Sequence, residues 1–395
     1  MSNPPLAGLK VVELARVLAG PWIGQTLADL GADVIKVESP EGDDTRRWGP
    51  PFMTTDGEVA AAYFHACNRG KRSIIADFST AHGREIVARL AAGADVLIEN
   101  FKAGGLEKYG LDYVSLSRSS PRLVYCSITG FGQTGPYAQR PGYDFMIQGM
   151  SGIMDLTGEA QGEPQKIGVA MADLVTGLYG VIAIQAALRH RERTGCGQLI
   201  DMALFDCMSG VLANQAMNFL ASGTSPKRSG NTHPNIAPYR TFEVADGQVI
   251  VACGNDRQFA RLCEVLELAQ LPCDARFQTN AARVQHSQAL SERLEARIRT
   301  QSRAHLLREL ERAGVPAGPI NSVADVFADP QFQSRAMRID PQGVPGLRTP
   351  ISFSRANLSL HRRSPRLGEH TDDICGEIGL TPEGNTAAKP EPGEA

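Results

Sequence analysis

The chain of 395 residues has no block of like charge, no long uninterrupted apolar run and few aromatic side chains. Its 40 basic and 43 acidic residues leave a formal net charge of −3, which argues against nucleic acid or an anionic membrane surface as a partner. The longest apolar stretch, Leu174–Leu188, is interrupted by glycines and is too short to cross a bilayer. These absences predict a water-soluble globular protein.

Two nucleotide-binding signatures are also not found where they would be expected. No GxGxxG fingerprint follows the first expected strand, and no GxxxxGK[ST] loop occurs anywhere in the chain. Dinucleotide binding and P-loop chemistry therefore lose support.

The eight cysteines are scattered, with no CxxC pair and no nearby histidine that would complete a zinc pattern. We therefore predict free thiols, no metal site and a reducing compartment. The first residues lack a charged segment followed by an apolar one, so no signal peptide is predicted. The expected location is the cytoplasm.

The first half of the chain alternates apolar strands with helices. This pattern is typical of an α/β fold with a mostly parallel sheet and helices on both faces. The expected strands are Lys10–Leu14, Asp33–Glu38, Arg72–Phe78, Asp95–Asn100, Leu123–Thr129 and Gln198–Leu204.

Composition divides the chain into two domains. We expect a large domain over residues 1–220, completed by residues 335–395, and a linker over residues 221–238 that is rich in Gly, Ser and Pro. A smaller α+β domain is expected over residues 239–325. Its signals are a hairpin that turns at Asp246-Gly247 and helices at about 256–266, 287–300 and 302–313.

Asp173 lies at the start of the Leu174–Leu188 run, which has helical character. The ordinary role of an acid at a helix start is an N-cap. The alternative is a nucleophile, because a desolvated carboxylate at a helix N-terminus can attack an activated acyl group. Spacing alone leaves both roles open.

Ligands of parallel sheets bind beyond the carboxyl ends of the strands. Four segments follow such strand ends in this sequence, and residues 130–168 are also unusually rich in glycine for a plain connection. The candidate segments are Arg16–Ala19, Ser39–Arg47, Asn100–Lys108 and Thr129–Tyr143.

Over nearly its whole length, the sequence resembles the class III CoA-transferases, the family of formyl-CoA transferase and carnitine CoA-transferase. Many short motifs in one fixed order carry the resemblance. They are Ala19–Pro21 (AGP), Gly31–Glu38 (GADVIKVE), Gly42–Arg46 (GDDTR), Asn68–Ile74 (NRGKRSI), Glu99–Phe101 (ENF), Ser127–Pro136 (SITGFGQTGP), Arg140–Asp144 (RPGYD), Met171–Leu174 (MADL) and Leu367–Thr371 (LGEHT).

The resemblance implies a Rossmann-like large domain, a small domain, and a homodimer of two chains interlinked like rings. It also implies that Asp173 is the catalytic aspartate. In the family, this carboxylate attacks an acyl-CoA thioester and then carries the acyl group and CoA in turn, as an anhydride and as an aspartyl-CoA thioester. Coenzyme A and acyl-CoA are then substrates, together with a free carboxylic acid, and no permanently bound cofactor is expected. We expect dicarboxylates such as succinate and glutarate.

Contacts to CoA are expected from seven residues. Leu18, Ala19 and Asn100 match family contacts, and Lys108 stands where the family often has an Arg. Charge and strand-end location add three basic side chains as phosphate partners. For each basic residue, a solvated surface charge is the ordinary alternative. The three are Lys71, Arg72 and Lys102.

Five residues are expected in the acyl pocket. Trp48 matches a pocket Trp of formyl-CoA transferase, although a core or interface role is equally open. Arg46 could hold the distal carboxylate of a diacid by paired hydrogen bonds, in competition with other arginines. The remaining pocket residues are Tyr143, Asp144 and Tyr239.

Tyr143 separates two branches of the family. The related α-methylacyl-CoA racemases place a His at this position, where it exchanges protons with the aspartate. A Tyr at this position favours transfer over racemisation, although Tyr143 could also be only a packed loop aromatic. A racemase-like epimerase and a non-catalytic CoA-binding protein remain as alternatives.

Overall fold

The computed structural model describes residues 3–382, and these divide into two compact units. The first comprises residues 3–153, 166–214 and 333–382, and the second comprises residues 154–165 and 215–332. Of the C-terminal segment expected to complete the large domain, residues 383–395 lie outside the described residues.

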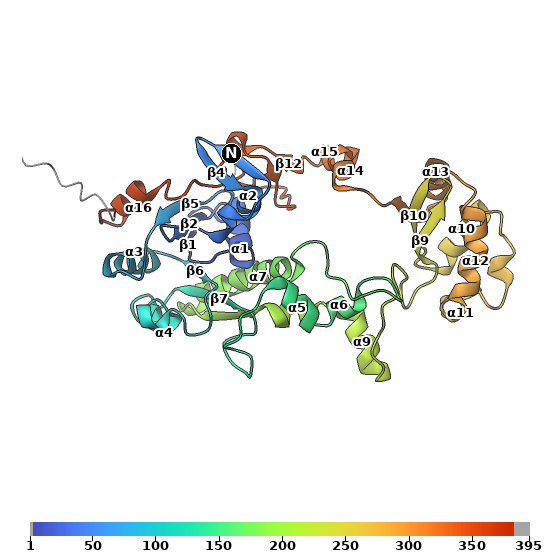
Figure 1. Cartoon of the computed structure of the whole chain (residues 1–395), viewed down its shortest axis with the longest axis horizontal. Helices are drawn as coiled ribbons and strands as arrows, with labels where there is room; N and C mark the ends of the chain where they lie inside the picture. Colours follow the sequence, from blue (N-terminus) through green and yellow to red (C-terminus); the bar gives the residue numbers. More distant parts are fainter. Residues whose placement is uncertain (1–2, 383–395) are drawn as a thin grey trace, which may run out of the picture. The chain divides into compact units, whose positions relative to one another are not determined.

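The first unit is built on a six-stranded parallel sheet in the order β5-β2-β1-β6-β7-β8 (Figure 1). Its strands are β1 (Lys10–Glu13), β2 (Asp33–Glu38), β5 (Arg72–Ile75), β6 (Val96–Glu99), β7 (Val124–Thr129) and β8 (Leu199–Ala203). All six lie where apolar runs predict them. The expected α/β class with a mostly parallel sheet is confirmed.

Helices cover both faces of this sheet, because successive strand residues point to opposite sides. Val11 of β1 packs in one core with the buried sides of α1, α7 and α8, whereas Val12 packs in a second core with α3, α4 and α16. The helices of this unit are α1 (Ala19–Asp29), α2 (Ala62–Cys67), α3 (Ala81–Ala92), α4 (Tyr113–Ser119), α5 (Asp144–Met150), α7 (Met171–Thr194), α8 (Leu204–Gly210) and α16 (Thr371–Glu377).

Helix α7 packs along α1 through two glycines. A Cβ atom on Gly177 would lie 2.9 Å from Trp22 Cδ1, and one on Gly180 would lie 2.3 Å from Ile23 Cδ1. The two helices therefore approach more closely than side chains at these positions would allow.

Helix α7 is longer than the apolar run that predicts it. Among the described residues it is the one helix that passes a length-and-composition criterion for a membrane span, a criterion that core helices of soluble proteins also meet. It contacts α1, α8, β7 and β8, which is the packing of a core helix.

A buried ion network ties β1, β2 and β5 together. Lys36 Nζ lies 3.2 Å from Glu13 Oε1 and 2.9 Å from Asp43 Oδ2, and all three side chains are buried. Lys71 also binds Glu13, at 2.8 Å. Buried charges of opposite sign are stable only when they are paired in this way.

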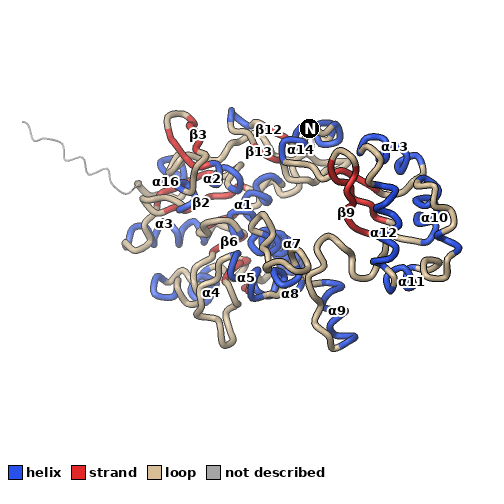
Figure 2. The backbone as a smooth tube through the Cα atoms, turned by 45° about the vertical axis from the view of Figure 1, so that its right-hand side comes forward, coloured by secondary structure: helices blue, strands red, loops and turns tan. Residues whose placement is uncertain are grey.

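The second unit contains a three-stranded antiparallel sheet and, between Asp256 and Arg312, four α-helices. Its strands are β9 (Tyr239–Val244), β10 (Gly247–Ala252) and β11 (Ala317–Pro319), and α12 packs on β9 (Figure 2). The helices are α10 (Asp256–Val265), α11 (Asn280–Gln285), α12 (Ser287–Ile298) and α13 (Arg303–Arg312). The predicted turn at Asp246-Gly247 joins β9 and β10.

Several elements differ from the sequence expectation. The sequence over about 206–220 favours a single helix, but the structure has two there, α8 and α9 (Ala213–Ser222), and Ala213 at the break has a left-handed backbone with φ 45°. A hairpin of β3 (Phe52–Thr55) and β4 (Glu58–Ala61) was not expected, although Asp56-Gly57 is a strong turn signal.

Shorter elements complete the described residues. They are α6 (Ile153–Leu156), α14 (Val323–Ala328), α15 (Pro330–Ser334), β12 (Arg338–Ile339), β13 (Gly346–Leu347) and the 3-10 turns at Asp44–Arg47, Glu107–Tyr109, Leu271–Cys273 and Pro341–Gly343.

The close approach of α1 and α7 gives a stability prediction. The substitution Gly177→Ala should lower the free energy of unfolding by about 1–3 kcal/mol, because the added methyl overpacks the Trp22 contact. Urea denaturation measures the change. Gly210→Ala is the matched control, because a Cβ there meets open space, and it should be neutral or slightly stabilising. Equal losses for both variants would contradict the prediction.

Candidate active site

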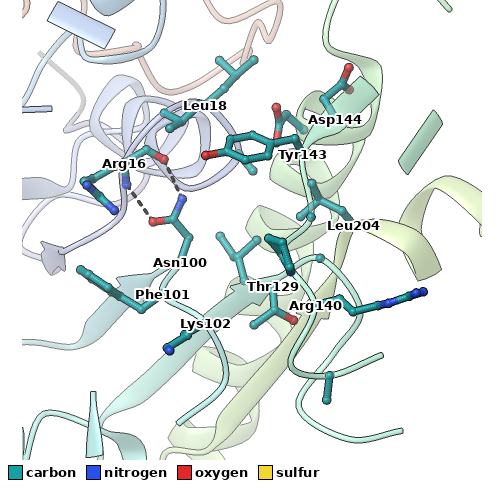
Figure 3. A pocket seen from close by; sticks show the side chains of 18 residues that line it. Arg16, Leu18, Asn100, Phe101, Lys102, Thr129, Arg140, Tyr143, Asp144 and Leu204 are labelled. Carbon is teal, nitrogen blue, oxygen red and sulfur yellow. Dashed lines mark hydrogen bonds between the residues drawn. The ribbon is translucent and has the colours of Figure 1, made fainter. Parts of the chain in front are cut away.

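A cavity of about 220 Å³ opens at the carboxyl ends of β1, β6 and β7 in the first unit (Figure 3). The β1–α1 turn, the segment after β6, the loop before α5 and the first turn of α7 contribute its walls. The lining residues are Arg16, Val17, Leu18, Ala19, Asn100, Phe101, Lys102, Ile128, Thr129, Gly130, Ala138, Arg140, Pro141, Gly142, Tyr143, Asp144, Asp173 and Leu204. This edge of the sheet is where ligands of parallel α/β folds bind.

Asp173 is half-buried in the first turn of α7. It is not the N-cap: that position is Ala170, which has no side-chain cap. Instead, Asp144 accepts a hydrogen bond from the Ala172 N–H at 2.7 Å. Among the described residues, no hydrogen bond engages the Asp173 carboxylate. The capping role that the sequence left open therefore falls to Asp144, and Asp173 remains available to a ligand.

Burial and a neighbouring charge both disfavour the ionised form of Asp173. Burial, and then the negative charge of Asp144, raise the pKa of the Asp173 carboxyl to about 7. A carboxylate with such a pKa is more basic than an ordinary aspartate, and perturbed values of this kind concentrate at functional sites.

Asp144 is held in place by a second hydrogen bond. Gln148 Nε2 donates to its other carboxylate oxygen at 2.8 Å, and Gln148 Oε1 accepts from the Ile167 N–H at 2.9 Å. Tyr143, the residue before it, is exposed and points into the pocket (Figure 3).

Tyr63 does not line the cavity but feels the charge of Asp173, and the sequence analysis missed it. Burial, and then the negative charge of Asp173, raise the pKa of its phenol to about 12. Trp48 packs edge-on against it, with ring centroids 5.4 Å apart. Tyr63 belongs to the short helix α2, which follows β4 of the unexpected hairpin and not a strand of the parallel sheet, so the strand-end rule gave no signal for it.

Asn100 connects two walls of the pocket. Its Oδ1 accepts the Arg16 N–H at 2.9 Å, and its Nδ2 donates to the Arg16 carbonyl at 2.6 Å (Figure 3). The Arg16 guanidinium lies over the Phe101 ring at 5.6 Å and pairs with Asp44 at 3.4 Å. The amide therefore fixes the main chain that leads to Leu18 and Ala19.

Two predicted phosphate partners do not reach the pocket. The Lys71 ammonium is fully buried and binds Glu13, Asn68 and the Pro21 carbonyl. Arg72 stands at the amino end of β5, the opposite edge of the sheet, and pairs with Asp33 and Glu377 at 2.6 Å. Both side chains are saturated by protein groups, which corrects their assignment to CoA phosphates.

Arg46 is likewise not free to hold a carboxylate of a ligand. Its guanidinium pairs with Glu38 at 2.7 Å and Glu58 at 3.0 Å and stacks on Phe64. Its expected substrate contact is therefore corrected to a structural role.

The remaining predicted residues are dispersed. Lys108 is exposed, with its ammonium 4.6 Å from the centroid of the Tyr109 ring. Tyr239 belongs to the second unit, where it lines a separate cavity of about 170 Å³ with His233 and Arg240. Arg140, which lies in the candidate segment Thr129–Tyr143 but was not singled out there, lines the first pocket and stacks on Tyr137.

The charge coupling of Asp173 and Asp144 is measurable. Carbon-13 NMR of labelled aspartate carboxyls should show one carboxyl, absent in Asp173→Asn, that titrates near pH 7. Asp144→Asn should move this titration to lower pH, because removing a neighbouring negative charge favours the ionised form. An unchanged titration in Asp144→Asn would contradict the coupling.

Comparison with known proteins places the chain in a family. The sequence model of CoA-transferase family III matches residues 6–371. The chain is 56% identical to succinate–glutarate CoA-transferase of Agrobacterium fabrum, over 95% of this chain and 96% of that protein. It is 41% identical to human succinyl-CoA:glutarate CoA-transferase, over 95% of this chain and 86% of that protein. The crystal structure of a CAIB/BAIF family protein from Brucella suis superposes with a TM-score of 0.87 at 70% identity, covering 96% of this chain and 100% of that one. The chain belongs to CoA-transferase family III and is a CoA-transferase.

Proposed function

We propose that this enzyme moves CoA from succinyl-CoA or a similar dicarboxylic acyl-CoA to a free dicarboxylate such as glutarate, through covalent intermediates on Asp173. The names of its similar relatives support the substrate class. The observation that carries the mechanism is Asp173 itself, a half-buried carboxylate with a raised pKa and no hydrogen-bond partner among the described residues, at the wall of a cavity.

The first half of the reaction loads CoA onto the enzyme. An Asp173 carboxylate oxygen attacks the thioester carbonyl carbon, the carbon–sulfur bond breaks, and CoA leaves as the thiolate. The thiolate then attacks the Asp173 carboxyl carbon of the resulting anhydride and expels the donor acid as a carboxylate. An aspartyl-CoA thioester remains.

The second half reverses these steps with the acceptor. The acceptor carboxylate attacks the aspartyl thioester and releases the thiolate, which then attacks the acceptor acyl carbon and frees Asp173. No water, proton or nucleotide is consumed. Thioester and anhydride are close in acyl-transfer potential, so each step is close to reversible.

The pocket geometry supports this chemistry. Partial desolvation makes the carboxylate a stronger nucleophile, and a shielded site limits hydrolysis of the anhydride. We assign contacts with CoA to Leu18, Ala19, Asn100, Lys102 and Lys108, the predicted residues that no buried ion pair saturates. Trp48, Tyr143 and Asp144 remain the proposed acyl-pocket residues of the first unit.

We further propose that the active form is a homodimer. The long helix α7 leaves Leu178 and Ile182 more than half exposed, and Met217 and Leu220 of α9 are exposed as well. Large apolar side chains that remain exposed on a single chain often mark a surface that a partner chain covers.

The proposed location is the cytoplasm, and no permanently bound cofactor is proposed because Asp173 supplies the covalent chemistry. All eight cysteines are free, and five of them are buried. Free thiols are typical of reducing compartments.

The nucleophile is tested by substitution and trapping. Asp173→Asn should reduce CoA transfer by at least about 10³-fold, because the covalent route is lost. Asp206→Asn changes an acid in the first turn of the neighbouring helix α8 and should transfer normally. Hydroxylamine added with succinyl-CoA should convert Asp173 to its hydroxamate, which peptide mass spectrometry detects. An unmodified Asp173 peptide would refute the covalent route.

The oligomeric state is tested in solution. Sedimentation should give one species of twice the 42.5 kDa chain mass. Ile182→Glu should dissociate it, because the charge would be buried unpaired at the interface. Val114→Glu, at an equally exposed position on α4, is the control and should leave the dimer intact. A monomeric wild-type enzyme would refute the assembly.

A further inference from the structure

Val17 has a backbone conformation that its side chain disfavours. Its φ of 71° lies in the left-handed region, where a β-branched residue is strained and glycine is not. Val17 lines the pocket that contains Asp173. Strained residues of this kind persist only where the surrounding groups hold them.

Side chains hold the main chain on both sides of Val17. The Val17 N–H points at both carboxylate oxygens of Asp43, at 3.3 and 3.4 Å, and the Val17 carbonyl accepts from Cys67 Sγ at 3.5 Å. Asn100 binds both the N–H and the carbonyl of Arg16. The main-chain N–H and carbonyl groups of both Arg16 and Val17 are thus engaged by side chains from elsewhere in the chain.

Asp43 is itself fixed from three directions. Lys36 Nζ lies 2.9 Å from its carboxylate, the Thr45 N–H and hydroxyl donate to it at 3.0 and 2.8 Å, and its own N–H donates to Glu38 at 3.0 Å. Burial alone would raise the pKa of the Asp43 carboxyl, but the Lys36 charge and the Thr45 N–H outweigh it and lower that pKa to about 2. The group that faces Val17 is therefore a rigid, ionised acceptor.

We infer that Asp43 is a positioning residue for acyl-CoA: it holds Val17 in the left-handed conformation and thereby presents the Leu18–Ala19 main chain to the pocket. The inference rests on the proposed function only in naming acyl-CoA as the ligand. Asp43 does not line the cavity, and its link to the cavity wall is its contact with the Val17 N–H. Asp173 stands on α7, a different element, so loss of Asp43 weakens binding more than turnover.

The test is a rescue experiment in the full-length enzyme. Asp43→Asn should raise the KM for succinyl-CoA about tenfold and leave kcat within about threefold of wild type, because the strained turn relaxes while the nucleophile stays. Val17→Gly in the Asp43→Asn background should return the KM to within about threefold of wild type, because glycine adopts this φ without help. A merely structural loss would not be restored by glycine at position 17.

The matched control is Ala336→Gly in the Asp43→Asn background. Ala336 also has a positive φ, 47°, but it is exposed and lies outside the pocket. The substitution Ala336→Gly should relieve local backbone strain equally, but the KM for succinyl-CoA should stay as high as in Asp43→Asn alone. Restoration by both glycines, or by neither, would overturn the inference.

Two further measurements keep the outcomes distinct. Calorimetric titration with CoA reports binding without transfer, so wild-type enzyme that binds CoA but transfers none refutes the proposed function and not this inference. If Asp43→Asn does not fold, Val17→Pro replaces it, because proline can neither adopt a positive φ nor donate to Asp43. Wild-type CoA affinity in Val17→Pro would overturn the inference.

Discussion

The first unit holds two carboxylates, Asp173 and Asp144, beside one cavity, and its active-site chemistry depends on this pair. Among the described residues, no cationic side chain forms an ion pair with either. Burial, followed by the negative charge of Asp144, raises the pKa of the Asp173 carboxyl to about 7. Helix α7 makes this arrangement tolerable. Its N-terminal N–H groups and dipole favour negative charge, and one of those N–H groups already binds Asp144.

Much of the fold follows from patterns that are local in sequence. Buried parallel strands are short apolar runs, and each of the six runs expected to be a strand forms a strand of the sheet. The break between α8 and α9 was not predictable in this way, because apolar periodicity continues through it and only the left-handed backbone of Ala213 interrupts it.

Site residues that follow strand ends could be predicted from the sequence. Residues whose role depends on an ion pair within the fold could not. Asn100, Lys102 and Tyr143 come after strands, and they meet Asp173 at one cavity. Lys71 and Arg46 have the right charge in the right motifs, but each pairs with a buried carboxylate, Glu13 and Glu38 respectively, which charge and motif alone do not reveal. Tyr63 was missed for the converse reason, since only tertiary packing brings α2 near Asp173.

The glycine contacts between α7 and α1 also bear on how insertions and deletions can accumulate here. Gly177 follows Asp173 by about one helical turn and clamps α7 against Trp22. Adding or removing one residue between these two positions would swing the carboxylate about 100° around the helix axis. Insertions or deletions between residues 157 and 170 would instead change the length of the loop that precedes α7. The four-residue spacing between Asp173 and Gly177 thus sets the direction in which the Asp173 carboxylate points into the cavity.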